Sequence, residues 1–275
     1  MRTEVFREFS PVKEKEPVHP VHPVLKVLHE RIESSSQPGK RTDPYKLVLA
    51  IEGGGMRGTV TAAMATTLDI LGLQNVFDEV YGSSAGSSSG GYFLAHQGVE
   101  AMRVYLDNIS NRDFIDLLRP LKGKPIVDLT FGFNEVMGKR IPINWEAINN
   151  SPVPLKILAT DVEKGEIAVL DKFTSQQDLL DALHASARMP VVAGMKPFEY
   201  RGRLFWDASL LDAFGINTAI NEGATHVLVL RSRPVGRQER KLSAFDRYIV
   251  ASYIRRYNSG LADLFLRRMN SEFNG

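Results

Sequence analysis

Two junctions in which an apolar run meets a turn of small residues constrain the fold of this chain most strongly. The first is "LVLAIEGGGMRGTVT" (Leu47–Thr61), and the second is "VYGSSAGSSSGG" (Val80–Gly91). Both have the order strand, tight turn, helix, which is typical of an α/β fold with a mainly parallel sheet. The predicted elements are strands at Lys46–Glu52 and Val76–Tyr81, a helix at Gly58–Leu71, and a helix that runs through His96.

Further along the chain, short apolar and turn patterns predict the rest of the sheet. A two-residue turn at Arg201-Gly202 inside "FEYRGRLFWD" predicts a hairpin. The segment Val99–Asn150 shows no regular period, and its apolar residues cluster around Val104, Leu106, Phe114, Leu117 and Leu118. The apolar residues of Val99–Leu118 either line an acyl pocket or pack in an ordinary core. The other predicted elements are strands at Leu155–Thr160, Glu166–Leu170 and Thr225–Ser232, and a helix at Ser175–Ala187.

The composition of the 275 residues is that of a globular protein, with 43% hydrophobic residues and enough length for one sizeable core. No linker rich in Pro, Ser or Gly divides its middle. We therefore expect an irregular N-terminal extension at 1–44 with a short helix near Val24–Glu33, one core at 45–234, and a basic helical segment at 235–275 that packs on the core.

The absence of cysteine excludes disulfides, metal–thiolate sites and a thiol nucleophile. No apolar run approaches the ~18 residues that span a bilayer, and the N-terminus has no apolar signal-peptide core. We expect a cytoplasmic protein that binds no nucleic acid. The sequence leaves the oligomeric state open.

Charge is distributed unevenly along the chain. The net charge is +2, but residues 231–275 carry +6, from nine Arg and one Lys against four acidic residues. The segment from Ser243 onward also contains several aromatic residues. It is either a helix pair that packs on the sheet with a solvated basic face, or a peripheral contact with an anionic membrane surface.

The second junction contains a candidate nucleophile. Gly82-Ser83-Ser84-Ala85-Gly86 fits G-x-S-x-G, a sharp strand-to-helix elbow that exposes its central serine. Gly82 and Gly86 leave room for the chain around the turn. Ser84 would lie at the start of a helix, where free N–H groups and the helix dipole favour negative charge.

The first junction is open to two interpretations. "GGGMRG" fits the dinucleotide-binding pattern G-x-G-x-x-G, which also needs an acidic residue at the end of the second strand. Asp78 and Glu79 have about the right spacing but precede that end, where the serine turn lies. Both turns follow C-terminal strand ends, so Gly53, Gly54 and Gly55 can face Ser84. We interpret this loop as an oxyanion hole.

A serine nucleophile needs a group that accepts its proton, and no histidine fits comfortably. His96 lies about 18 Å along the helix that Ser84 begins. His184 falls inside a predicted helix. His226 follows Ser84 and Asp207 in the order of α/β-hydrolases, yet it starts a strand and so lies at the opposite edge of a parallel sheet.

Asp207 is the better candidate for the base. It ends the strand "RLFWD" and is followed by the small residues Ala208 and Ser209, while Phe205 and Trp206 can partly desolvate it. Asp207 capping a turn, or Asp212 acting in its place, are the alternatives. A carboxylate base is weak, so the oxyanion hole is expected to carry much of the catalysis.

The ordered set of motifs resembles the patatin-like phospholipase family. The set is "GGGMRG", then "GSSAG", then "ASARMP" at Ala185–Pro190, then Asp207 in a turn of small residues, and it covers roughly Tyr45–Pro234. The resemblance implies a three-layer α/β/α sandwich, a Ser–Asp dyad without histidine, and hydrolysis of lipid acyl esters without metal or cofactor. Ser84 would be the nucleophile and Asp207 the base.

The same resemblance implies that Gly53, Gly54 and Gly55 form the oxyanion loop and that Arg57 supports it. One departure is that Asp207-Ala208-Ser209 replaces the usual Asp-Gly-Gly or Asp-Gly-Ala. Alanine resists backbone angles that glycine permits, which affects the placement of Asp207. The predicted function is a serine lipid acyl hydrolase. A catalytically weakened lipid-binding protein and a dinucleotide-dependent oxidoreductase are the alternatives.

Overall fold

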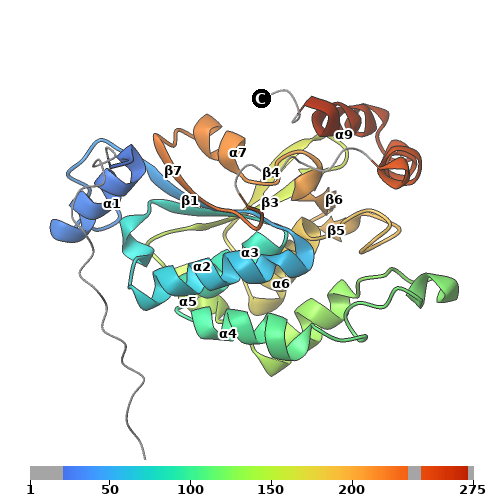
Figure 1. Ribbon diagram of the computed structural model, residues 1–275, viewed down its shortest axis with the longest axis horizontal. Coiled ribbons are helices and arrows are strands. Elements are labelled where there is room, and N and C mark those ends of the chain that lie inside the picture. The colour runs from blue at the N-terminus through green and yellow to red at the C-terminus, as the bar shows by residue number, and fades with distance from the viewer. Residues whose placement is uncertain (1–20, 235–242, 272–275) are drawn as a thin grey trace, which may run out of the picture.

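A mixed seven-stranded sheet forms the centre of the molecule in a computed structural model, which describes residues 21–234 and 243–271 (Figure 1). Hydrogen bonds connect the strands along the path β5-β6-β3-β2-β1-β7, and β4 pairs with β3. The strands are β1 Leu47–Ile51, β2 Glu79–Ser83, β3 Leu155–Asp161, β4 Glu166–Leu170, β5 Phe198–Tyr200, β6 Arg203–Asp207 and β7 His226–Leu230.

Most strands of this sheet run in one direction, as predicted. β7, β1, β2 and β3 pair in parallel, and within the described sheet only β4 and β6 run against the others. The second strand begins later than predicted. Gln74–Val76 forms a 3₁₀-turn, and Val76 and Phe77 are buried in the core as part of that turn. In the sequence, these two buried apolar residues therefore look like the start of the strand that follows.

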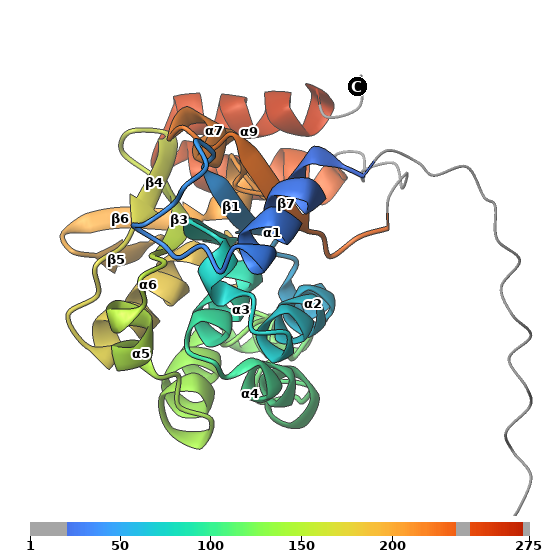
Figure 2. The same cartoon turned by 90° about the vertical axis from the view of Figure 1, so that its left-hand side faces the viewer.

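Helices cover both faces of the sheet, so the α/β/α expectation is confirmed (Figure 2). Successive residues of a strand point to opposite faces of the sheet. Alternate side chains of β1 therefore pack against the helices on opposite sides of the sheet. Leu47, Leu49 and Ile51 join the larger core. Val48 packs with Ala219 on the other face. The helices of the central part are α2 Gly58–Ile70, α3 Ala85–Leu94, α6 Gln176–Ser186 and α7 Ile216–Asn221.

The segment without a predicted period, 99–150, is helical but unusual. It contains α4 Gly98–Arg103, π-helical stretches at Val104–Asn108 and Phe131–Arg140, and α5 Trp145–Asn150. A π-helix has i→i+5 hydrogen bonds, so its buried residues do not recur with the α-helical period. This difference explains why the sequence shows apolar clusters there without a helical pattern.

The N-terminal part of the described chain is fastened to the sheet by one buried arginine. Helix α1 spans Pro23–Glu33, and its Arg31 is 2% exposed. The Arg31 guanidinium forms ion pairs at 2.9 Å with Asp43 and with Asp78. Since a buried charge is tolerated only when it is paired, these contacts fix α1 beside the start of β2.

The C-terminal helices cover β6. They are a π-helical stretch at Phe245–Val250, α8 Ala251–Arg255 and α9 Ser259–Ser271. Their apolar side chains pack around Trp206, which is fully buried. Residues 1–20, 235–242 and 272–275 lie outside the described part. The predicted boundaries at 44/45 and 234/235 stay predictions. Among the described helices, none is both long and apolar enough to cross a membrane.

Candidate active site

The candidate nucleophile and base meet because two strands pair, one after the other, with the same edge of β3. β4 occupies one edge of β3 along residues 157–161, so β2 and β6 both use the other edge. Ser83 at the end of β2 lies opposite Leu158, and Asp207 at the end of β6 lies opposite Ala159. The turn after β2 therefore faces the end of β6.

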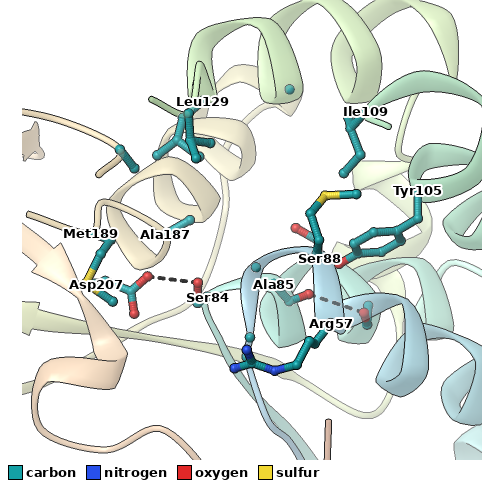
Figure 3. Close-up of a pocket in the computed structure, with 18 of the residues that line it drawn as sticks. Arg57, Ser84, Ala85, Ser88, Tyr105, Ile109, Leu129, Ala187, Met189 and Asp207 are labelled. Carbon is teal, nitrogen blue, oxygen red and sulfur yellow. Dashed lines mark hydrogen bonds between the residues drawn. The ribbon is translucent and has the colours of Figure 1, made fainter. Parts of the chain in front are cut away.

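Ser84 lies on a strained elbow between β2 and α3. Its backbone angles are φ 54° and ψ −123°, a region that residues other than glycine rarely adopt. A Cβ on Gly86 would lie 2.1 Å from the backbone oxygen of Ile51, so the close approach requires glycine there. The Ser84 hydroxyl donates to Asp207 Oδ2 at 2.8 Å (Figure 3). The structure thus brings together the two residues on which the sequence argument depends.

Two further hydrogen bonds hold Asp207 in place, one to its carboxylate and one to its backbone. The Ser209 N–H donates to Asp207 Oδ1 at 2.8 Å, and the Thr160 hydroxyl donates to the Asp207 backbone oxygen at 2.9 Å. Asp207 is 2% exposed. Ala208 is buried in the 3₁₀-helix Ala208–Leu210 and is not among the described residues with positive φ. Alanine fits this backbone, so the departure from the glycine pattern leaves the carboxylate in place.

The glycine loop packs directly against the serine turn. A Cβ on Gly53 would meet the Ser83 backbone oxygen at 2.6 Å and Ser84 Cβ at 2.9 Å. Gly54 and Gly55 have φ of 150° and 58°, so the loop turns its amides in a way that other residues resist. Within the described chain, the N–H groups of Gly53, Gly54 and Gly55 donate no hydrogen bond. They are therefore available to an anionic oxygen beside Ser84.

Arg57 follows this loop and, like Ser84 and the glycines, lines a cavity. Its side chain is exposed. Figure 3 shows Arg57 at the same end of the cavity as Ser84 and Asp207. The predicted supporting residue therefore lies at the site.

Ser186 is a site residue that the sequence argument missed. The backbone N–H of Ser84 donates to Ser186 Oγ at 2.8 Å, and the hydroxyls of Ser186 and Ser87 lie 3.0 Å apart. Ser186 is fully buried at the end of α6. It belongs to "ASARMP", so the motif marked its neighbourhood, but no spacing rule placed α6 against the elbow.

The histidines weighed as bases lie away from Ser84. His96 is exposed and approaches Asp69. His226 pairs with Leu47 at the start of β1, the opposite edge of the sheet from the elbow. His184 is buried and stacks on the ring of Phe198 at 4.1 Å. Burial, with a smaller effect of the Arg188 charge, lowers the pKa of His184 to about 3, so the ring is neutral near pH 7.

The alternative acidic residues serve structural contacts. Asp212 accepts hydrogen bonds from the N–H groups of Gly215 and Thr218, which fixes the start of α7. Asp78 accepts from Arg31 and Arg41, and Glu79 forms ion pairs with two lysines. Neither Asp78 nor Glu79 is therefore placed to hold a ribose. Among the described residues, no group of three or more His, Cys, Asp or Glu side chains could hold a metal ion.

A cavity of about 510 Å³ opens from this site into the helical layer. Ser84, Asp207 and Arg57 lie at one end of the cavity in Figure 3, and Leu129 and Ile109 lie toward the other end. Both π-helical stretches of the 99–150 segment contribute to its wall, which agrees with the frequent occurrence of π-helix at functional sites. The apolar wall includes Val104, Ile109, Phe114, Leu129, Phe133 and Met137. Leu106, Leu117 and Leu118, which the sequence left open between pocket wall and core, belong to neither and are exposed.

Comparison with known proteins identifies the family of the chain. The family sequence model described as patatin-like phospholipase matches residues 49–220. The chain is also 26% identical over 195 residues to "Uncharacterized protein YjjU" of Escherichia coli (strain K12), an alignment that covers 70% of this chain and 53% of that protein. The chain thus spans about half the length of the curated relative it matches.

Proposed function

The chain belongs to the patatin-like phospholipase family, and we propose that it is a serine hydrolase that cleaves fatty acyl esters of phospholipids or other glycerolipids. The observation that carries this proposal is the 2.8 Å hydrogen bond from the Ser84 hydroxyl to Asp207, beside a loop whose amide groups donate to no described residue. A buried hydroxyl, a carboxylate and several N–H donors at the end of an apolar cavity suit an ester with a long acyl chain.

The proposed reaction has two halves. In the first, Asp207 accepts the Ser84 proton while Ser84 Oγ attacks the ester carbonyl. The resulting oxyanion is bound by the N–H groups of Gly53, Gly54 and Gly55. The carbon–oxygen bond to the alcohol then breaks, and the alcohol leaves with the proton from Asp207. In the second half, Asp207 takes a proton from water, the water attacks the acyl-enzyme, and Ser84 regains its proton as the fatty acid departs.

Electrostatic stabilisation is the main contribution in this scheme. Aspartate is a weaker base than histidine near neutral pH, so the barrier must be lowered chiefly where charge develops on the carbonyl oxygen. The backbone angles of Gly54 and Gly55 support this assignment, since they orient the loop amides before substrate arrives. Fixed donors need no reorganisation during the reaction, and this lowers the barrier further.

Labelling with a fluorophosphonate tests the proposal directly. The reagent should modify the purified chain, and peptide mapping should place the adduct on Ser84. Ser84→Ala should abolish both the label and hydrolysis of a short acyl ester, while its unfolding curve stays close to that of the parent chain. Full esterase activity in Ser84→Ala would refute the proposal. A chain that binds lipid but resists the label would instead be a binding protein of the same fold.

A further inference from the structure

Three leucines project into solvent from a segment beside the cavity. The side chains of Leu117, Leu118 and Leu121 are 75%, 62% and 84% exposed. They belong to residues 110–127, which extend from the helical layer as the green segment at the right of Figure 1. Single exposed leucines need no explanation, but three within five positions form a local apolar surface. We call Leu117, Leu118 and Leu121 the leucine surface.

The segment that carries the leucine surface is well ordered by internal contacts. Arg119 donates from its guanidinium to four backbone oxygens of the segment, those of Arg112, Asp113, Phe114 and Ile126, at 2.7 to 3.3 Å. Ile115 and Val127 also form an antiparallel bridge. These contacts satisfy the backbone of the loop and hold its shape. The outward position of the leucines is therefore part of a defined conformation.

The opposite side of the same segment forms part of the cavity wall. Phe114, Ile115 and Val127 line the cavity that begins at Ser84 and Asp207. One short piece of chain thus presents apolar side chains to the cavity on one side and to the surroundings on the other. An apolar ligand that enters the cavity near this segment would remain next to apolar surface.

Exposed basic residues flank the leucine surface along the sequence. Arg112, Lys122 and Lys124 are exposed, whereas Arg119 is occupied by backbone oxygens. The only acidic residues of 110–127 are Asp113 and Asp116, so the segment has a net charge of +2. Apolar side chains flanked by Lys and Arg are the combination that binds the interface of an anionic membrane.

We propose that residues 110–127 dock this protein on an anionic phospholipid surface, with the leucine surface in the headgroup–acyl boundary. This inference rests on the proposed hydrolase function and names the physical form of its substrate, a lipid aggregate. Two observations select a lipid surface over a second copy of the chain. The basic residues complement anionic headgroups, and the segment is continuous with the wall of the apolar cavity.

Vesicle co-sedimentation tests the docking separately from catalysis. Ser84→Ala protein should sediment with vesicles of phosphatidylglycerol and phosphatidylcholine, and much less with phosphatidylcholine alone. Adding L117S, L118S and L121S should lower the vesicle partition coefficient at least about tenfold, because the apolar area no longer inserts. The matched control is I70S with L71S, which removes two leucine-sized side chains, 74% and 63% exposed, at the far end of α2. This control should bind like the parent.

Charge reversal provides the second arm of the test. K122E with K124E should weaken binding to the anionic vesicles by about fivefold or more per lysine. Raising the salt concentration should weaken the parent in the same direction. Equal binding of parent and charge-reversed chains would overturn the electrostatic half of the proposal.

Two other results would overturn the docking assignment. Binding that is lost only in a F245S, Y248S and I249S variant would place the contact on the C-terminal helical segment, where these exposed side chains lie. A parent that is dimeric by analytical ultracentrifugation, with a monomeric leucine variant and no vesicle binding, would make the leucine surface a chain–chain interface. In the unmutated Ser84 background, hydrolysis of a soluble short ester reports separately on the catalytic centre.

Discussion

Ser84 donates its backbone N–H to the hydroxyl of Ser186 at 2.8 Å, so the end of α6 holds the turn that carries the proposed nucleophile. Three elements thus fix the elbow: β3 sets the ends of β2 and β6, the glycine loop packs on one side, and α6 contacts the backbone. The strained angles of Ser84 persist because these contacts over-determine them.

Removing the Ser186 hydroxyl should disturb the elbow without touching the reacting atoms. In Ser186→Ala the buried Ser84 N–H loses its acceptor, which should lower the free energy of unfolding by about 1–3 kcal/mol. The same change should lower kcat on a short ester more than it changes KM, since Ser84 is misplaced. Denaturant unfolding and steady-state kinetics measure the two effects. The control is Ser87→Ala, which leaves the Ser84 N–H paired and should cost about 1 kcal/mol or less. Equal effects of the two substitutions would contradict a positioning role for Ser186.

The choice between a dyad and a triad can be tested with two substitutions. Asp207→Asn keeps the shape of the side chain but cannot take up the Ser84 proton, so kcat/KM should fall on the order of 10²–10⁴-fold. His226→Ala should leave kcat/KM unchanged, because His226 begins β7 at the opposite edge of the sheet. Hydrolysis of a soluble ester measures both. Loss of activity in the histidine variant alone would restore a histidine base.

The local sequence was sufficient for the two junctions that build this site. Glycine at 53, 82 and 86 marks places where backbone approaches backbone, and the C-terminal ends of parallel strands share one edge of a sheet. From these two facts the sequence predicted that the glycine loop and Ser84 face each other. The hairpin at Arg201-Gly202 was equally local, and it places Asp207 at a strand end.

Features that depend on long-range pairing were not predictable in the same way. The register that places Asp207 opposite Ala159 is set between β6 and β3, far apart in the chain. Ser186 contacts Ser84 across 102 residues, and no periodic pattern encodes that contact. Part of the cavity wall is π-helical, at Val104–Asn108 and Phe131–Arg140. Its apolar residues therefore do not recur with the α-helical period, and a pattern based on that period does not predict them.

The alanine after Asp207 should stabilise the fold. Ala208 is fully buried beside Tyr81 and Leu158, in a backbone conformation that alanine adopts readily. Ala208→Gly, which restores the glycine that the family usually has after this aspartate, should therefore lower stability by about 1–2 kcal/mol through lost burial and greater backbone freedom. It should keep kcat/KM within roughly twofold of the parent. A large gain in activity would show that the alanine does misplace the carboxylate.

The glycine at position 86 should tolerate no side chain. In Gly86→Ala the new Cβ would meet the Ile51 backbone oxygen, so backbone must move, at a cost of at least about 3 kcal/mol. In Gly90→Ala, a change in the same helix, the new Cβ would meet the ends of the Val80, Leu155 and Ile51 side chains and no backbone atom among its three nearest neighbours. That control should stay within about 1 kcal/mol of the parent, because helix propensity offsets the contact. Thermal unfolding of both variants measures the difference, and similar costs would refute the close-approach argument.

Acid should destabilise the fold through His184 before it protonates the carboxylates. The pKa of His184 is lowered to about 3 in the folded chain, against 6.5 for an ordinary histidine. Between these values the unfolded chain binds one more proton than the folded chain, so stability must fall as pH decreases through 6.5. The fall is about 1.4 kcal/mol per pH unit once the pH is well below 6.5, or about 2 kcal/mol between pH 7 and pH 5.

A neutral side chain at position 184 isolates this effect from the other titrating groups. His184→Gln has no proton to gain, so its stability relative to the parent should improve by about 2 kcal/mol when the pH falls from 7 to 5. Burial acts to raise the pKa of Asp178, but the hydrogen bonds that it accepts from Arg201 and Thr174 outweigh burial and lower this pKa to about 2. Asp178 therefore stays ionised in this window in both proteins. Urea unfolding at half-unit steps of pH measures the difference. Parallel pH profiles for parent and variant would mean that His184 is protonated in the folded chain, in which case the neutral ring stacked on Phe198 is wrong.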